Sequence, residues 1–190
     1  MTETRPYGPT GDVTRHLPRA ELDARHAMLA QAPRDTGTLR LIVRRRGDGV
    51  RETPDRVRLS PEEGVPGDDW IRLTPDDPTA QLTVMRHDVA ELIANGQPLT
   101  VFGDNLFVDL DISAPNLPVG TRIKVGDATV EMSPKPHNGC QKFAGRFGAD
   151  ALRFVGDPAT RHENRRGIYW TVIEAGDVTP GDLVTVVSRA

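Results

Sequence analysis

One segment of the chain reads Val119-Gly120-Thr121-Arg122-Ile123-Lys124-Val125-Gly126-Asp127-Ala128-Thr129-Val130-Glu131-Met132. Apolar and polar residues alternate on both sides of Gly126-Asp127, which is the pattern of a β-hairpin with a glycine-containing turn. The alternation puts four apolar side chains on one face of the hairpin, namely Ile123, Val125, Val130 and Met132. We expect this face to pack on a hydrophobic core.

Further short segments with strand character surround this hairpin. Residues 107–112 alternate strictly, and we expect residues 167–176 and 182–187 to pair with each other through the connection 177–181. No βαβ alternation and no glycine-rich phosphate loop is apparent, which disfavours Rossmann and P-loop folds. Recurrent Gly-Asp turns between short strands instead predict a mainly β fold, a small barrel with a few short helices, because closure removes exposed sheet edges.

The remaining segments predict the domain organisation. Residues 20–32 are rich in helix formers and stop at Pro33, which predicts a peripheral helix, and residues 87–94 predict a second short helix. Residues 140–154 predict two short helical pieces broken at Gly148, whereas residues 60–78 are dense in Pro, Gly and Asp and predict a long loop. We therefore expect an N-terminal arm with its helix over residues 1–37 and one barrel domain over residues 38–190.

Composition limits the class of protein. The chain has 190 residues, a formal net charge of −3 and a single cysteine, so it forms no intramolecular disulfide framework and suits a reducing compartment. The N-terminal residues lack an apolar targeting segment, and no stretch approaches the roughly 18 apolar residues of a membrane span. We expect a soluble cytoplasmic protein that binds neither membrane nor nucleic acid.

The lone cysteine, Cys140, lies in a turn-rich and basic part of the sequence. Residues 135–166 hold seven Lys and Arg against three Asp and Glu, so an acidic chain carries a basic island that attracts anions. Nearby cations favour the thiolate, which is the form that acts as nucleophile and soft-metal ligand. The alternative is a structural cysteine, since free cysteine is often buried as a small hydrophobe.

The chain resembles the MOSC domain, which is named for the C-terminal domain of molybdenum cofactor sulfurase. The resemblance covers residues 39–187 and rests on an ordered set of segments around the one cysteine: Gly64-Val65-Pro66-Gly67-Asp68-Asp69-Trp70, Gly103-Asp104-Asn105-Leu106, residues 117–127, Cys140 with Lys142, Arg166-Gly167-Ile168-Tyr169-Trp170, and residues 176–184. It implies a barrel-like fold that binds the molybdenum cofactor. It also implies that the cysteine either ligates molybdenum or carries sulfur as a persulfide.

Candidate site residues follow from the chemistry that such a cofactor needs. Cys140 is the candidate metal ligand and, with His137, a candidate catalytic residue, because His137 is three residues away and an imidazole titrates near neutral pH. Guanidinium groups bind phosphate bidentately and an ammonium group binds it as a point charge. The candidate cofactor-binding residues are Asn105, Lys142, Arg161, His162, Arg165 and Arg166.

Three functions remain open. The resemblance implies an oxidoreductase that catalyses reduction, or oxygen or sulfur transfer, on a small molecule such as an N-hydroxylated compound. We expect a separate electron-donor or sulfur-transfer protein because the chain has no iron–sulfur or flavin motif. A sulfur carrier or pterin-binding module using a Cys140 persulfide is the first alternative. A cysteine hydrolase pairing Cys140 with His137 or His162 is the second. One cysteine with scattered histidines does not suffice for a structural zinc site.

Overall fold

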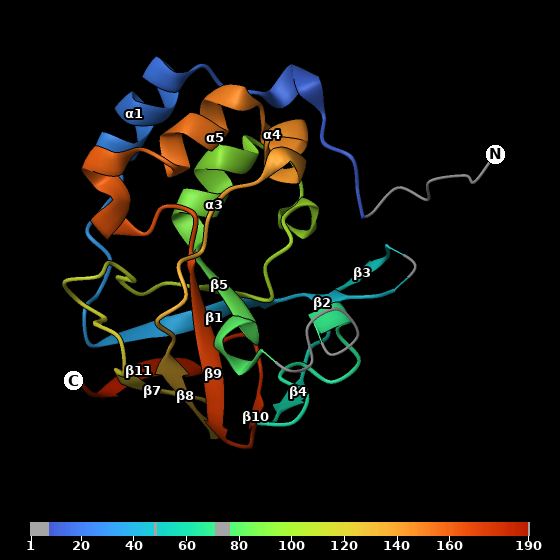
Figure 1. Cartoon of the computed structure of the whole chain (residues 1–190), viewed down its shortest axis with the longest axis vertical. Helices are drawn as coiled ribbons and strands as arrows, with labels where there is room; N and C mark the ends of the chain where they lie inside the picture. Colours follow the sequence, from blue (N-terminus) through green and yellow to red (C-terminus); the bar gives the residue numbers. More distant parts are fainter. Residues whose placement is uncertain (1–7, 48, 71–76, 190) are drawn as a thin grey trace.

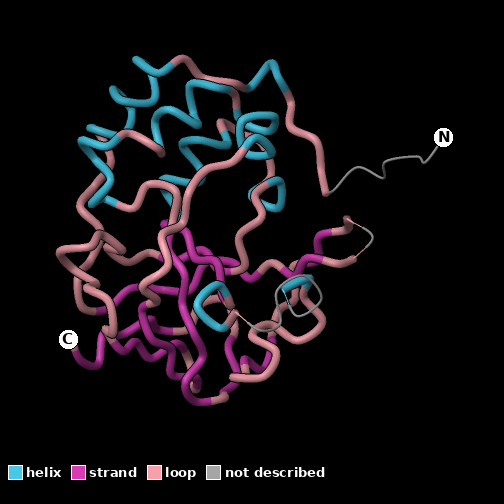
Figure 2. Tube along the Cα trace, in the orientation of Figure 1, coloured by secondary structure: helices cyan, strands magenta, loops and turns pink. Residues whose placement is uncertain are grey.

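The computed structural model describes residues 8–47, 49–70 and 77–189 (Figure 1). In this part of the chain, seven strands form a closed barrel in the order β1-β11-β7-β8-β9-β5-β6, and the helices gather at one end of it (Figure 2). The predicted mainly β barrel with short helices is therefore confirmed. Parts of three predictions lie outside the described residues: the start of the N-terminal arm, Asp48 in the Gly47-Asp48-Gly49 turn, and residues 71–76 of the long loop.

The elements have the following bounds. The barrel strands are β1 (Thr36–Ile42), β5 (Leu82–Arg86), β6 (Leu106–Val108), β7 (Arg122–Val125), β8 (Ala128–Met132), β9 (Ile168–Glu174) and β11 (Leu183–Ser188). Two small sheets lie beside the barrel and pair β2 (Arg44–Arg45) with β3 (Arg51–Glu52) and β4 (Val57–Leu59) with β10 (Gly176–Val178). The helices are α1 (Arg19–Ala27), α3 (His87–Ala94), α4 (Gln141–Phe147) and α5 (Ala149–Val155), with the 3-10 turns η1 (Val13–Arg15), η2 (Pro78–Ala80), η3 (Leu99–Val101) and η4 (Pro158–Glu163).

The β7–β8 hairpin forms as predicted. Ile123 lies opposite Val130 and Val125 opposite Ala128, and the side chains of this face are buried in the barrel core. Gly126 at the turn has a φ of 52°, and a Cβ there would collide with the carboxylate of Asp182. Glycine is required at this position because the backbone is left-handed and the connection before β11 lies directly against it.

The predicted pairing of residues 167–176 with 182–187 is wrong. β9 pairs with β8 and β5, whereas β11 pairs with β7 and β1, so the β7–β8 hairpin separates them in the sheet. Between the two strands, β10 leaves the barrel and pairs with β4. Alternation showed which face of β7 and β8 is buried but held no information about which strand lies beside another.

The barrel contains one βαβ unit, although the sequence shows no βαβ alternation. β5 and β6 are parallel neighbours, and α3 belongs to the connection between them. The α3 bounds match the prediction, and Asn95 ends the helix with a left-handed φ of 47°. β6 itself is short: it covers Leu106–Val108, so only residues 107 and 108 of the predicted segment 107–112 lie in it.

A second hydrophobic cluster joins the helices to the barrel. All five phenylalanines of the chain lie in it, and the rings of Phe102 and Phe147 stack at a centroid distance of 4.1 Å. Burial of each ring contributes about 1.5–3 kcal/mol. Two of these rings, Phe143 and Phe147, belong to α4, so the cluster fixes the helix that begins directly after Cys140.

The N-terminal arm is tied to the segment after α3 and to the end of α4. The backbone N–H of Asp12 donates to Oε1 of Gln97 at 2.8 Å, and Nε of Arg146 donates to the carbonyl of Pro9 at 3.2 Å.

α1 packs against α3 and α5, and it ends at Ala27, five residues before the predicted end. β1 begins at Thr36, two residues ahead of the proposed domain boundary. None of the helices in the described ranges has the length and apolarity of a membrane-spanning segment.

Candidate functional site

Cys140 is exposed at the start of α4 and lines a surface hollow of about 140 Å³. The hollow has an apolar wall of Phe102, Phe143 and Phe147. Its other walls carry five cationic side chains from three parts of the chain, namely Arg45, Arg51, Lys142, Arg146 and Arg166. We call this the cationic hollow. The structural alternative for the cysteine, a thiol sealed in the core, is wrong.

Positive charge is concentrated in the cationic hollow. Burial, together with the guanidinium groups of Arg146 and Arg45, lowers the pKa of Arg51 from its ordinary value. The Nε atoms of Arg51 and Arg166 are buried and have no hydrogen-bond partner among the described residues. Buried donors without acceptors are rare in folded proteins, and the like charges around them make an anion the favoured acceptor.

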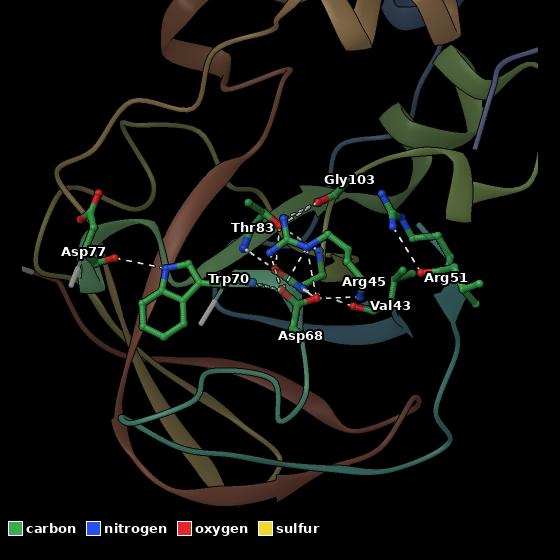
Figure 3. A network of polar contacts seen from close by, with 10 residues as sticks. Val43, Arg45, Arg51, Asp68, Trp70, Asp77, Thr83 and Gly103 are labelled. Carbon is green, nitrogen blue, oxygen red and sulfur yellow. Dashed lines mark hydrogen bonds and ion pairs between the residues drawn. The ribbon is translucent and has the colours of Figure 1, made fainter. Parts of the chain in front are cut away.

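Arg45 is fixed by a buried carboxylate (Figure 3). Its Nη2 lies 2.5 Å from Oδ2 of Asp68, and its backbone N–H donates to Oδ1 at 2.7 Å. Nη1 of Arg45 also donates to the carbonyl of Gly103 at 3.0 Å. Asp68 belongs to the Gly-Asp loop quoted above and is 3% exposed. The loop therefore holds one wall of the cationic hollow in place.

Arg166 is fixed by a second buried carboxylate. Its Nη1 donates to both oxygens of Asp104, at 3.0 and 2.9 Å, and Asp104 is fully buried. The guanidinium carbon of Arg166 lies 5.0 Å from the centre of the Phe143 ring, within the range of a cation–π contact. Arg166 is thus held between the barrel and α4.

His137 lies behind the same carboxylate. Its imidazole is 6% exposed, its Nδ1 lies 3.7 Å from Oδ1 of Asp104, and its ring centre lies 4.5 Å from that of Tyr169. Burial, and then the charges of Arg166 and Arg45, hold its pKa well below 6.5. The expectation of titration near neutral pH is therefore wrong, and His137 is a neutral imidazole at pH 7.

A second hollow of about 300 Å³ adjoins the cationic hollow. Residues 136–139 line it, whereas the next residue, Cys140, lines the cationic hollow, and Arg166 lines both. The other lining residues are Leu152, Val155, Gly156, Arg161 and Asn164. We call this the amphipathic hollow.

The predicted site residues are partly brought together. Lys142 and Arg166 lie with Cys140 on the cationic hollow, and His137 and Arg161 lie on the amphipathic hollow. Nη2 of Arg161 donates to Oδ1 of Asn138 at 2.9 Å. The basic residues that were predicted to form one cluster around the thiol thus line two neighbouring hollows, which share Arg166.

Three predicted residues lie elsewhere. Asn105 is fully buried and lines neither hollow; its Oδ1 accepts from the hydroxyl of Thr83 at 2.8 Å and its Nδ2 donates to Asp68 at 3.0 Å. Arg165 covers the Phe154 ring at 4.5 Å and bonds Glu163 at 2.8 Å. His162 is exposed in η4, and its carbonyl accepts from the backbone of Ala114.

Sequence reasoning missed Arg45 and Arg51 because both lie far from Cys140 along the chain. The run Arg44-Arg45-Arg46 was a visible signal, but only the fold shows that the β2–β3 hairpin reaches α4. Asp104 lay within a quoted motif, and its buried pairing with Arg166 spans 62 residues.

Within the described ranges, no group of three or more His, Cys, Asp or Glu is placed to hold a metal ion by itself. No hydrogen bond joins Cys140 to His137 there.

The fold and site define a class: small β-barrel proteins with a helical layer and one exposed thiol at the edge of a basic hollow. The chain belongs to the MOSC domain family, because the sequence model of that family matches residues 76–185. This family is associated with binding of the molybdenum cofactor. Comparison with curated proteins found no match.

Solved structures support the fold. A hypothetical protein of known crystal structure is 20% identical to this chain, with a TM-score of 0.61, and the match covers 82% of this chain and 70% of that one. YuaD from Bacillus subtilis is 18% identical, with a TM-score of 0.57 and coverage of 82% and 98%. YiiM from Escherichia coli is 21% identical, with a TM-score of 0.54 and coverage of 80% and 71%.

Proposed function

We propose that the protein binds the molybdenum cofactor in the cationic hollow, with Cys140 as the thiolate ligand of the metal, and acts as an oxidoreductase on a small molecule. One observation carries the proposal: the only cysteine of the chain is exposed at the edge of a hollow that five cations line. A cysteine binds a soft metal through its thiolate sulfur.

The donor set fits an anionic, sulfur-rich cofactor. Five cations line the hollow, and guanidinium and ammonium groups bind phosphate, so the lining suits an anionic group. The unpartnered Nε of Arg51 is a donor that such a group would satisfy. The hollow holds about 140 Å³, below the ~300 Å³ of small-ligand pockets, so it would enclose only part of the cofactor.

Each residue has a stated role in this proposal. Cys140 would hold the metal, Arg51, Arg146 and Arg166 would bind anionic groups, and Lys142 would add a point charge. The cofactor, when bound, supplies two-electron redox chemistry with oxygen-atom transfer. Asn105, His162 and Arg165 receive no cofactor contact in this proposal because they lie outside both hollows.

His137 has a modified role. Because it is neutral at pH 7, it would offer one ring N–H as a hydrogen-bond donor and the other nitrogen as a proton acceptor. At this pH it would carry no imidazolium proton to deliver. Electrons would come from a separate protein, as the sequence predicts.

The experiment measures molybdenum and pterin in protein purified from a host that makes the cofactor. We expect stoichiometric metal in the wild-type chain, loss of metal in Cys140→Ser, and loss of both metal and pterin in the double variant Arg51→Ala/Arg146→Ala. The matched control is Arg40→Ala/Arg122→Ala, which removes two exposed arginines from the barrel surface. Full molybdenum and pterin in Arg51→Ala/Arg146→Ala would contradict the proposal.

The same preparations separate the alternatives. Bound cofactor without reduction of N-hydroxylated compounds by a chemical reductant favours a sulfur carrier, and a persulfide on Cys140 would then appear in the intact mass. Ester or amide cleavage without molybdenum, abolished by alkylation of Cys140, favours the hydrolase.

A further inference from the structure

We propose that the amphipathic hollow binds a small organic monocarboxylate, with the carboxylate on Arg161 and Arg166 and the apolar body on Leu152 and Val155. This site is distinct from the cationic hollow in its lining, although the two share Arg166. Naming its ligand as the substrate rests on the proposed function, whereas the binding itself does not.

Two of the residues that line this hollow carry an unpartnered buried polar atom. The imidazole of His137 is 6% exposed and the side chain of Arg166 is 10% exposed, and both residues line the hollow. Nδ1 of His137 and Nε of Arg166 have no hydrogen-bond partner among the described residues. Nδ1 of His137 lies 3.7 Å from Oδ1 of Asp104, so Nε of Arg166 is the donor that a ligand would complete, because polar atoms are costly to bury unpaired.

Charge selects the sign of the ligand. Two arginines line the amphipathic hollow and no Asp or Glu is among its described lining residues. Asp104 accepts both hydrogen bonds from Nη1 of Arg166 and so balances one of the two charges. Arg161 bonds only the neutral Asn138 among the contacts of its side chain in the described ranges, and one uncompensated cation matches a monoanion.

The apolar wall and the size select the rest of the ligand. Leu152 and Val155 line the hollow with carbon atoms, which favours an organic body over an inorganic anion. A volume of about 300 Å³ accommodates a ligand of about ten non-hydrogen atoms, taking ~30 Å³ for each. A nucleotide or a peptide exceeds this volume.

The hollow also lies in a suitable place. Residues 136–139 line it and the next residue, Cys140, lines the cationic hollow, so one continuous segment borders both proposed sites. Arg166, which both hollows share, would contact the carboxylate of the ligand.

The test uses the full chain without added cofactor and two probes, benzoate and its neutral isostere benzamide. Titration of ¹⁵N- and methyl-labelled protein would be followed at Nε of arginine and at the methyl groups of Leu and Val. We expect benzoate to shift Arg161, Arg166, Leu152 and Val155, and benzamide to bind about tenfold more weakly because it lacks the charge.

Two variants make the test specific. Arg161→Gln should weaken benzoate binding about fivefold, whereas the matched control Arg153→Gln should not, since Arg153 is exposed, pairs with Asp150 and lies outside the hollow. Leu152→Trp should abolish binding by filling the hollow, with the methyl spectrum reporting whether the core is intact. Equal benzoate affinity in Arg161→Gln and Arg153→Gln, or shifts confined to Arg51 and Arg146, would overturn the proposal.

The molybdenum assay distinguishes this proposal from the proposed function. Benzoate bound at the amphipathic hollow of a chain that never takes up molybdenum would leave the carboxylate site standing and remove only its role as a substrate site. Molybdenum uptake without carboxylate binding would overturn the carboxylate site and leave the proposed function standing.

Discussion

Arg166 and Asp104 form a buried ion pair in which one guanidinium nitrogen, Nη1, donates to both carboxylate oxygens at 3.0 and 2.9 Å. The pair joins the loop before β6 to the turn before β9, and it lies between the cationic and amphipathic hollows because Arg166 lines both. The geometry of both proposed sites therefore depends on one carboxylate that no solvent reaches.

Asp104→Asn should be strongly destabilising. The substitution leaves the Arg166 charge buried without its counter-charge, and removal of one partner of such a pair costs about 3–5 kcal/mol. Urea unfolding of the cofactor-free chain measures the loss. The control Asp109→Asn breaks an exposed pair with Arg40 and should cost less than about 1 kcal/mol. Similar losses in the two variants would show that the buried pair contributes little.

Arg51→Met should separate stability from cofactor binding. Arg51 is partly buried beside Arg146 and Arg45, so its removal relieves repulsion in the empty site and should raise the free energy of unfolding by about 0.5 kcal/mol after solvent screening. The same variant should take up less molybdenum. Thermal unfolding and metal analysis of one preparation test both effects, and a less stable variant with full metal would refute this interpretation of the hollow.

His137 should make stability fall at acid pH. Its native pKa lies well below 6.5 because the imidazole is buried and Arg166 and Arg45 lie near it; Asp104 at 3.7 Å is already engaged by Arg166, and the facing Tyr169 is uncharged. Below pH 6.5 the unfolded chain gains a proton that the native chain does not, so stability decreases as pH falls, by up to about 1.4 kcal/mol per pH unit.

The measurement is the free energy of unfolding at pH 7.5, 6.5 and 5.5 for the wild type and for His137→Phe, which keeps an aromatic ring beside Tyr169. We expect the wild type to lose more stability than the variant between pH 6.5 and 5.5. Parallel curves would mean that His137 titrates alike in the folded and unfolded chains.

Substitutions of Asn105 and Lys142 should differ in their effects on stability and on molybdenum content. Asn105→Ala removes the partner of Thr83 and Asp68 inside the protein and should cost about 2–3 kcal/mol, because buried polar groups are left unpaired. Lys142→Ala changes an exposed side chain of the cationic hollow and should lower molybdenum content with little effect on unfolding. Denaturant titration and metal analysis of both variants decide the matter; a stable Asn105→Ala chain without metal would make Asn105 a cofactor contact.

Local patterns predicted local structure well. Alternation around Gly126-Asp127 identified the β7–β8 hairpin, and helix formers ending at Asn95-Gly96 identified α3. Strand order was not predictable in this way, because alternation fixes the buried face and not the neighbour, and the pairing of β9 with β11 was consequently wrong.

The candidate site shows the same division between local and long-range information. A lone cysteine among cations and turn residues indicated an exposed thiol, and Lys142 and Arg166 do line its hollow. Arg45 and Arg51 could not be assigned, since only the closed barrel brings their hairpin to α4. The low pKa of His137 likewise depends on burial by distant residues, which a sequence neighbourhood of turn formers does not reveal.

X-ray absorption at the molybdenum edge tests the Cys140 ligand most directly. It is recorded on the wild-type chain and on Cys140→Ser, both purified from a host that supplies the cofactor. We predict that molybdenum in the wild type has one more sulfur neighbour than the molybdenum that the variant retains. Identical sulfur coordination in two fully loaded proteins would contradict a thiolate ligand at Cys140.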